Sequence, residues 1–144
     1  MMKLVQQPTP DSCTSACLSM LTNVDVNDVV SSFHNDWKSL SSNPSEFLSH
    51  HGIRHSVNKD VFSHKVNWGN VYLLTVPSLN IEGGLHHIVL DLTGDFENVL
   101  DPNNGKDGKK YYIGWSCDAI GLQVQLKSWM VDIAISGDEY CERS

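Results

Sequence analysis

The sequence has little positive charge and no long apolar run. Lys and Arg total 10 against 17 Asp and Glu, which gives a formal net charge of −7. A dedicated nucleic-acid-binding domain would show a basic face instead, so the composition argues against nucleic acid as a partner. No stretch approaches the about 18 consecutive apolar residues of a membrane span, so we expect no membrane partner either.

The N-terminal residues lack the apolar stretch of a secretory signal. Residues 1–8 carry one positive charge, several polar residues and Pro8. We therefore expect a cytoplasmic protein. In that compartment the four cysteines, Cys13, Cys17, Cys117 and Cys141, are expected to be reduced thiols rather than disulfides.

Internal repeats and low-complexity tracts are also missing. The 144 residues are 40% hydrophobic and 19% charged, which is ordinary globular composition. A chain of this length fits one domain, residues 1–144, and buries roughly two-thirds of its unfolded surface. Nothing in the sequence predicts the oligomeric state.

Helix signals gather in the first part of the chain. Apolar spacing, N-caps and a terminating glycine predict three helices: residues 13–21, capped by Asp11 and Ser12; Val26–His34; and residues 44–51, with Asn43 as N-cap and Gly52 at the end.

Strand signals follow in the second part. β-branched and alternating runs predict strands at Ile53–Val57, Val71–Val76, His87–Leu92, Asn98–Leu100, Lys110–Ile113 and Val131–Ile135. Leu122–Trp129 is ambiguous, and the polar tail from Ser136 is expected to fray. Helices followed by strands predict an α+β domain.

Cys13 is a candidate nucleophile because it stands at the predicted start of a helix. Free backbone N–H groups and the helix dipole stabilise a thiolate there and lower its pKa. The alternative is that Cys13 is only a small buried apolar residue.

Two histidines and an aspartate could assist such a nucleophile. His86 and His87 open a predicted strand, where neighbouring side chains point to opposite faces, so only one can face the site. Asp101 follows the next strand and could orient the histidine ring. Each residue also has a plain reading, as a solvated strand histidine or as part of an Asp-Pro turn.

Gln7 precedes the cysteine by six residues. A side-chain amide held beside the backbone N–H of Cys13 would supply two donors for an oxyanion.

In their order along the chain, these residues resemble a known family. Residues 7–21 read Gln-Pro-Thr-Pro-Asp-Ser-Cys-Thr-Ser-Ala-Cys-Leu-Ser-Met-Leu, which is similar to the opening of the C39-like cysteine peptidases of papain fold. Residues 87–90 resemble the family's His-aromatic-Val-Val strand, and residues 99–105 its Asp-Pro-x-x-Gly segment. The resemblance covers about residues 4–105.

The resemblance implies N-terminal helices packed on an antiparallel sheet, a peptide or protein substrate, and no cofactor or metal. It also implies a nucleophilic Cys13, a proton-carrying His87, an orienting Asp101 and an oxyanion-binding Gln7. Alignment of the strand favours His87, and His86 remains the alternative.

Two departures from the family pattern stand out. Thr14 follows the cysteine where the family usually has glycine, which could crowd the substrate carbonyl or shift the oxyanion hole. Ile88 takes the aromatic position if His87 is catalytic, whereas His87 takes it if His86 is catalytic.

Other functions remain open. The same triad could run acyl transfer or deamidation, and a papain-fold module without catalysis could bind or inhibit a partner. A structural zinc on Cys13, Cys17 and the two histidines is a further alternative, although the spacing is not an established zinc pattern.

Overall fold

The computed structural model describes residues 2–58 and 63–139, and in this part of the chain the helical elements precede the strands, except for residues 137–139, which are helical after the last strand. The helical elements are α1 (Cys13–Thr22), α2 (Val26–Val29), the π-helical turn η1 (Val30–His34), α3 (Asn35–Lys38) and α4 (Pro44–His50). The strands are β1 (Ser56–Val57), β2 (Asn70–Pro77), β3 (Leu85–Asp91), β4 (Asn98–Leu100), β5 (Tyr111–Ile113), β6 (Gln123–Gln125) and β7 (Met130–Ser136).

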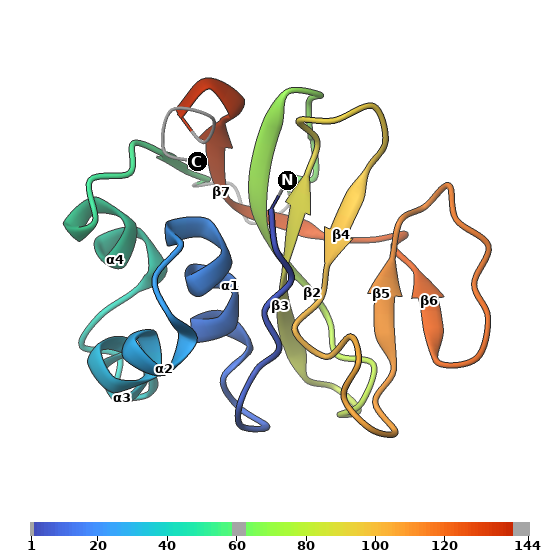
Figure 1. Cartoon of the computed structure of the whole chain (residues 1–144), viewed down its shortest axis with the longest axis horizontal. Coiled ribbons are helices and arrows are strands. Elements are labelled where there is room, and N and C mark those ends of the chain that lie inside the picture. Colours follow the sequence, from blue (N-terminus) through green and yellow to red (C-terminus); the bar gives the residue numbers. More distant parts are fainter. Residues whose placement is uncertain (1, 59–62, 140–144) are drawn as a thin grey trace.

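Five strands form one sheet in the order β1-β7-β2-β3-β4, and every neighbouring pair is antiparallel. β5 and β6 pair separately, in parallel. The helices gather on one side of the sheet, with α1 next to the strands and α2, α3 and α4 farther out (Figure 1). This combination of helices and antiparallel sheet confirms the predicted α+β class.

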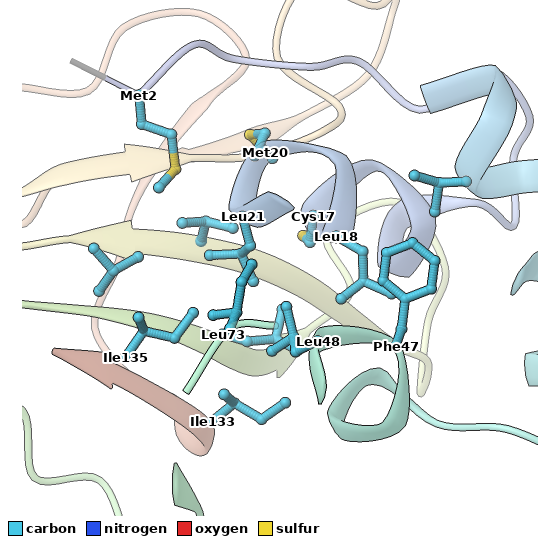
Figure 2. Packing of buried hydrophobic residues seen from close by; sticks show 14 of the residues in the cluster. Met2, Cys17, Leu18, Met20, Leu21, Phe47, Leu48, Leu73, Ile133 and Ile135 are labelled. Atoms are coloured by element: carbon cyan, nitrogen blue, oxygen red, sulfur yellow. The ribbon is translucent and has the colours of Figure 1, made fainter. Parts of the chain in front are cut away.

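Helix α1 is the centre of the main hydrophobic core. Residues 14–21 are all buried, as expected of a helix with packing partners on every side. Figure 2 shows Leu18 and Leu21 of α1 directed toward Leu73 of the sheet, with Leu48 of α4 nearby, and all four belong to one buried cluster. Packing on all sides fixes where the first residue of this helix lies.

The two faces of the sheet bury different residues. On β2 and β3, the odd-numbered Leu73 and Val89 face the helix-side core, whereas the even-numbered Leu74 and Ile88 belong to a second core on the opposite face. This alternation follows from the two-residue period of a strand, and it separates adjacent side chains of β3.

Most predicted elements are confirmed, with differences at their ends. The second helix does not end at His34, because the helical conformation continues through η1 and α3 to Lys38. Trp37 explains the extension: its ring stacks on Phe33, with centroids 6.0 Å apart, and packs against the main core. β1 is shorter than predicted, and the ambiguous segment Leu122–Trp129 contains β6.

The predicted cap of α1 is wrong in its chemistry. Ser12 does precede the helix, but its hydroxyl bonds to the backbone of Thr9, accepting from the N–H and donating to the C=O, each at 3.0 Å. Ser12 therefore stabilises the loop before the helix instead of the first helical turn.

The prediction that the tail frays from Ser136 is wrong for its first residues. Residues 137–139 are helical, and buried Glu139 accepts from the Arg54 guanidinium at 2.7 Å. The remaining tail, with Cys141, lies outside the described residues.

The N-terminal segment is tied to the turn after β4. Gln7 N–H donates to the carbonyl of Pro102 at 3.1 Å, and Lys106 Nζ donates to the carbonyl of Gln7 at 2.5 Å. The Gln6 amide reaches the carbonyl of Asn104 at 2.9 Å. These bonds join the loop before α1 to a turn 95 to 99 residues later in the chain.

Gly105 makes that junction possible. Its φ is +89°, in the region that favours glycine, and a Cβ there would lie 2.3 Å from Nε2 of Gln6. We predict that Gly105→Ala lowers the free energy of unfolding by about 1–2 kcal/mol, since it adds backbone strain and displaces the Gln6 amide.

Urea denaturation would measure this effect, with Gly94→Ala as the control. Gly94 has no positive φ and open space around its Cα, so its substitution is expected to be near neutral. Equal effects of the two substitutions would contradict the role given to Gly105.

Candidate active site

Cys13 is the first residue of α1 and is half-buried in a cleft of about 950 Å³. As the first residue of the helix, it has a backbone N–H without an intrahelical partner. The positive end of the helix dipole lies at the same place. A thiolate at this position is stabilised and still reachable from the cleft.

His86, not His87, is the histidine that contacts both Cys13 and Asp101. The His86 ring is close enough to the Cys13 thiol to lower its pKa, and Nε2 of His86 lies 2.7 Å from Oδ1 of Asp101. The expectation that His87 faces Asp101 is therefore wrong, and the alternative left open in the sequence is the one that the geometry supports.

Strand register explains the choice of His86. β4 pairs with β3 so that Val99 faces Leu90 and Leu100 faces Val89. Continuing this register places residue 101 opposite Ile88, on the face that carries the even-numbered side chains of β3. His86 shares that face, whereas His87 points to the other one.

Asp101 is held by more than the histidine. It is 1% exposed, and its Oδ1 also accepts from the N–H of Asn103 at 2.9 Å. Its Oδ2 accepts from the N–H of Tyr112 at 2.8 Å. Because both oxygens have partners, the carboxylate has one orientation, in which it fixes the His86 ring. The expected contact between Asp101 and a histidine is thus present, although with the other histidine.

Cys13 and His86 shift each other's titration. Burial is the largest influence on the Cys13 thiol and raises its pKa. Hydrogen bonding and charge from His86, followed by the backbone hydrogen bond and charge of His87, outweigh burial and lower the pKa to about 7 from an ordinary 9.0. Burial lowers the pKa of His86, yet the bonds to Asp101 and Cys13 raise it to about 9. Between these two values, the pair exists as thiolate and imidazolium.

Gln7 lies in the cleft, but its amide does not reach out as expected. Its Nε2 donates to the carbonyls of Thr9 at 3.1 Å and Pro10 at 3.0 Å, and its buried Oε1 has no partner. The predicted oxyanion donor is therefore engaged with its own loop in this structure. An oxyanion would have to draw the amide away from these carbonyls.

His87 belongs to a separate set of contacts. Its Nδ1 lies 2.7 Å from Oγ1 of Thr14, and its Nε2 lies 2.9 Å from Oδ2 of Asp132. The sequence analysis missed Asp132 as a cleft residue. Its signal was a charged side chain inside the apolar run Val131–Ile135.

The structure does not bring Cys13, Cys17, His86 and His87 together as the ligands of a zinc ion. Cys17 is fully buried, and burial, with Cys13 and Asp101 nearby, raises its pKa well above the ordinary range. It packs as a neutral thiol in the main core. Within residues 2–58 and 63–139, no three His, Cys, Asp or Glu side chains are arranged to hold a metal ion.

We predict that iodoacetamide alkylates Cys13 with a rate that rises through about pH 7, because its pKa is lowered to that value. Cys17 should stay unreactive because it is buried, and the exposed Cys117 provides an internal reference. Peptide mass after timed alkylation at a series of pH values measures each rate.

Two matched variants separate the histidines. His86→Gln is expected to move the Cys13 midpoint toward 9.0, since it removes the main group that lowers this pKa. His87→Gln is expected to have the smaller effect. A larger shift in His87→Gln than in His86→Gln would contradict the assignment.

Comparisons with protein-family models, with curated proteins and with solved structures found no match. No helix among the described residues is long and apolar enough to cross a membrane.

Proposed function

We propose that this chain is a cysteine peptidase of the C39-like type with a papain-like fold, which hydrolyses a peptide or isopeptide bond. The observation that carries the proposal is the placement of His86, which hydrogen-bonds to Asp101 and lowers the pKa of Cys13, the first residue of a helix in an open cleft. A central helix packed on an antiparallel sheet supports the fold assignment.

The chemistry follows from the ion pair. The Cys13 thiolate attacks the amide carbonyl carbon, and the carbonyl oxygen becomes an oxyanion beside the Cys13 N–H. The His86 imidazolium gives its proton to the leaving amine, and the C–N bond breaks to leave a thioester. Neutral His86 then takes a proton from water, the hydroxide attacks the thioester, and the thiolate and imidazolium are restored.

A peptide segment is the substrate class that the cleft suits best. Its volume, about 950 Å³, lies at the upper end of the range of ligand pockets. Ile81 and Leu85 line it and are 62% and 70% exposed, so they offer apolar contacts beside the polar groups around Cys13. Acyl transfer to an amine, or deamidation of a glutamine side chain, would use the same residues on a related amide.

A binding module without turnover is the second candidate, and the position of Gln7 favours it. An amide bound to two carbonyls of its own loop is not free to stabilise an oxyanion. Such a module would keep its partner binding in Cys13→Ala, whereas a peptidase would lose its activity.

We predict that the protein cleaves members of a mixed peptide library and that Cys13→Ala does not. The activity on the best-cleaved peptide should rise through about pH 7, where the thiolate forms, and fall through about pH 9, where His86 loses its proton. Mass spectrometry of the products would detect cleavage, and a control digestion with Gly94→Ala would show full activity. No Cys13-dependent product at any pH between 7 and 9 would overturn the peptidase proposal and support the binding module.

A further inference from the structure

A second hydrogen-bonded chain lies beside the proposed catalytic residues. It runs from Thr14 Oγ1 to His87 Nδ1, 2.7 Å apart, and from His87 Nε2 to Asp132 Oδ2, 2.9 Å apart. The Thr75 hydroxyl donates to the same carboxylate oxygen. Both ring nitrogens of His87 are therefore engaged, on a side chain that is 14% exposed.

A β-bulge brings Asp132 to this position. Leu73 of β2 pairs with Ile133, but the next residue, Leu74, pairs with Val131, so Asp132 is an extra residue on β7. The bulge lets Asp132 point to the same face as Ile133, toward Thr75 and His87. Bulges of this kind commonly redirect a side chain next to an active site.

The two histidines of β3 contact the first two residues of α1. His86 and Cys13 shift each other's pKa, and the His87 ring hydrogen-bonds to Thr14, whose Oγ1 lies 3.9 Å from the Cys13 sulfur. The Thr14 hydroxyl thus lies between the sulfur and the His87 ring. Thr14 is 4% exposed, so bulk water does not compete with the contacts of its hydroxyl.

The protonation state of His87 decides where the Thr14 hydrogen goes. In neutral His87, the Nε2–H donates to Asp132, so Nδ1 must accept from the Thr14 hydroxyl. In protonated His87 both nitrogens donate, and the Thr14 oxygen accepts from Nδ1–H. Its own hydrogen is then available to the Cys13 sulfur, where it stabilises the thiolate.

We propose that Thr14 is a positioning residue that passes the protonation state of the His87–Asp132 pair to the Cys13 thiolate. This rests on the proposed function only in that Cys13 is an activated thiolate. No covalent bond of Thr14 is broken, because only the direction of its hydroxyl hydrogen changes. The hydroxyl of Thr14, which stands where the C39-like family usually has glycine, then has a role in this chain.

The groups around His87 come from several elements. Asp132 is contributed by β7, Thr75 by β2, Cys13 and Thr14 by α1, and the Trp37 ring by α3, with its centroid 6.3 Å away. His86 precedes His87 on β3, and the other charged side chains that line the cleft are Asp11, Glu46 and Lys109. Asp132 is the one of these carboxylates with a hydrogen bond to His87.

The test measures Cys13 alkylation by iodoacetamide against pH in the full chain. Thr14→Val keeps the shape of the side chain but removes the hydroxyl, and Thr14→Ser restores a hydroxyl as the matched control. Below pH 7, Thr14→Val is expected to react about threefold more slowly than wild type, which corresponds to a midpoint raised by about half a unit. Thr14→Ser is expected to react like wild type.

A structural role of Thr14 is separated by repeating the substitution in His87→Gln. If the hydroxyl acts through His87, Thr14→Val has no further effect in that background. If Thr14→Val does not fold, which a thermal melt detects, then His87→Gln alone is expected to slow Cys13 alkylation below pH 7, and an unchanged rate overturns the proposal.

The proposal is overturned if Thr14→Val reacts like wild type at every pH, or if it slows the reaction equally with and without His87. In both cases a wild-type midpoint near pH 7 leaves the proposed function standing. A wild-type Cys13 that titrates as an ordinary thiol overturns the proposed function and the role of Thr14 together.

Discussion

The hydrogen bond between the buried carboxylate of Asp101 and the ring of His86 is the contact on which the site depends. Asp101 is itself fixed by the backbone N–H groups of Asn103 and Tyr112, so it joins the end of β4, the turn that follows and β5. A carboxyl group with so little exposure is tolerated because each oxygen accepts hydrogen bonds. The same bond raises the pKa of His86, which lets the ring lower that of Cys13.

Because side chains alternate along a strand, the two adjacent histidines of β3 contact different groups. His86 points to the face that carries Asp101, and His87 points to the face that carries Thr75 and Asp132. Both rings still reach α1, because the helix is held by packing on every side and begins beside β3. A single strand therefore connects the nucleophile with two separate carboxylates.

Local signals were enough to predict the class of the fold and several boundaries. Asn43 accepts from the N–H of Glu46 as an N-cap, and α4 ends before Gly52, whose φ is positive. The roles of the site residues were harder to predict from the sequence, because their positions depend on contacts between distant segments. The choice between His86 and His87 depends on the register of β3 against β4, which no short motif encodes. Asp132 reaches the cleft only through a bulge, and Gln7 turns inward because two carbonyls of its own loop accept its amide hydrogens.

The most direct test of this account is to measure the protonation state of the His86 ring. Nitrogen NMR of the side chain would measure it in wild type and in Cys13→Ala. Between pH 7 and pH 9, the account predicts protons on both ring nitrogens in wild type, and a lower pKa of His86 once the thiolate is removed. A His86 ring with a single proton throughout that range, or one that does not respond to the loss of Cys13, would contradict the ion pair on which the proposed chemistry rests.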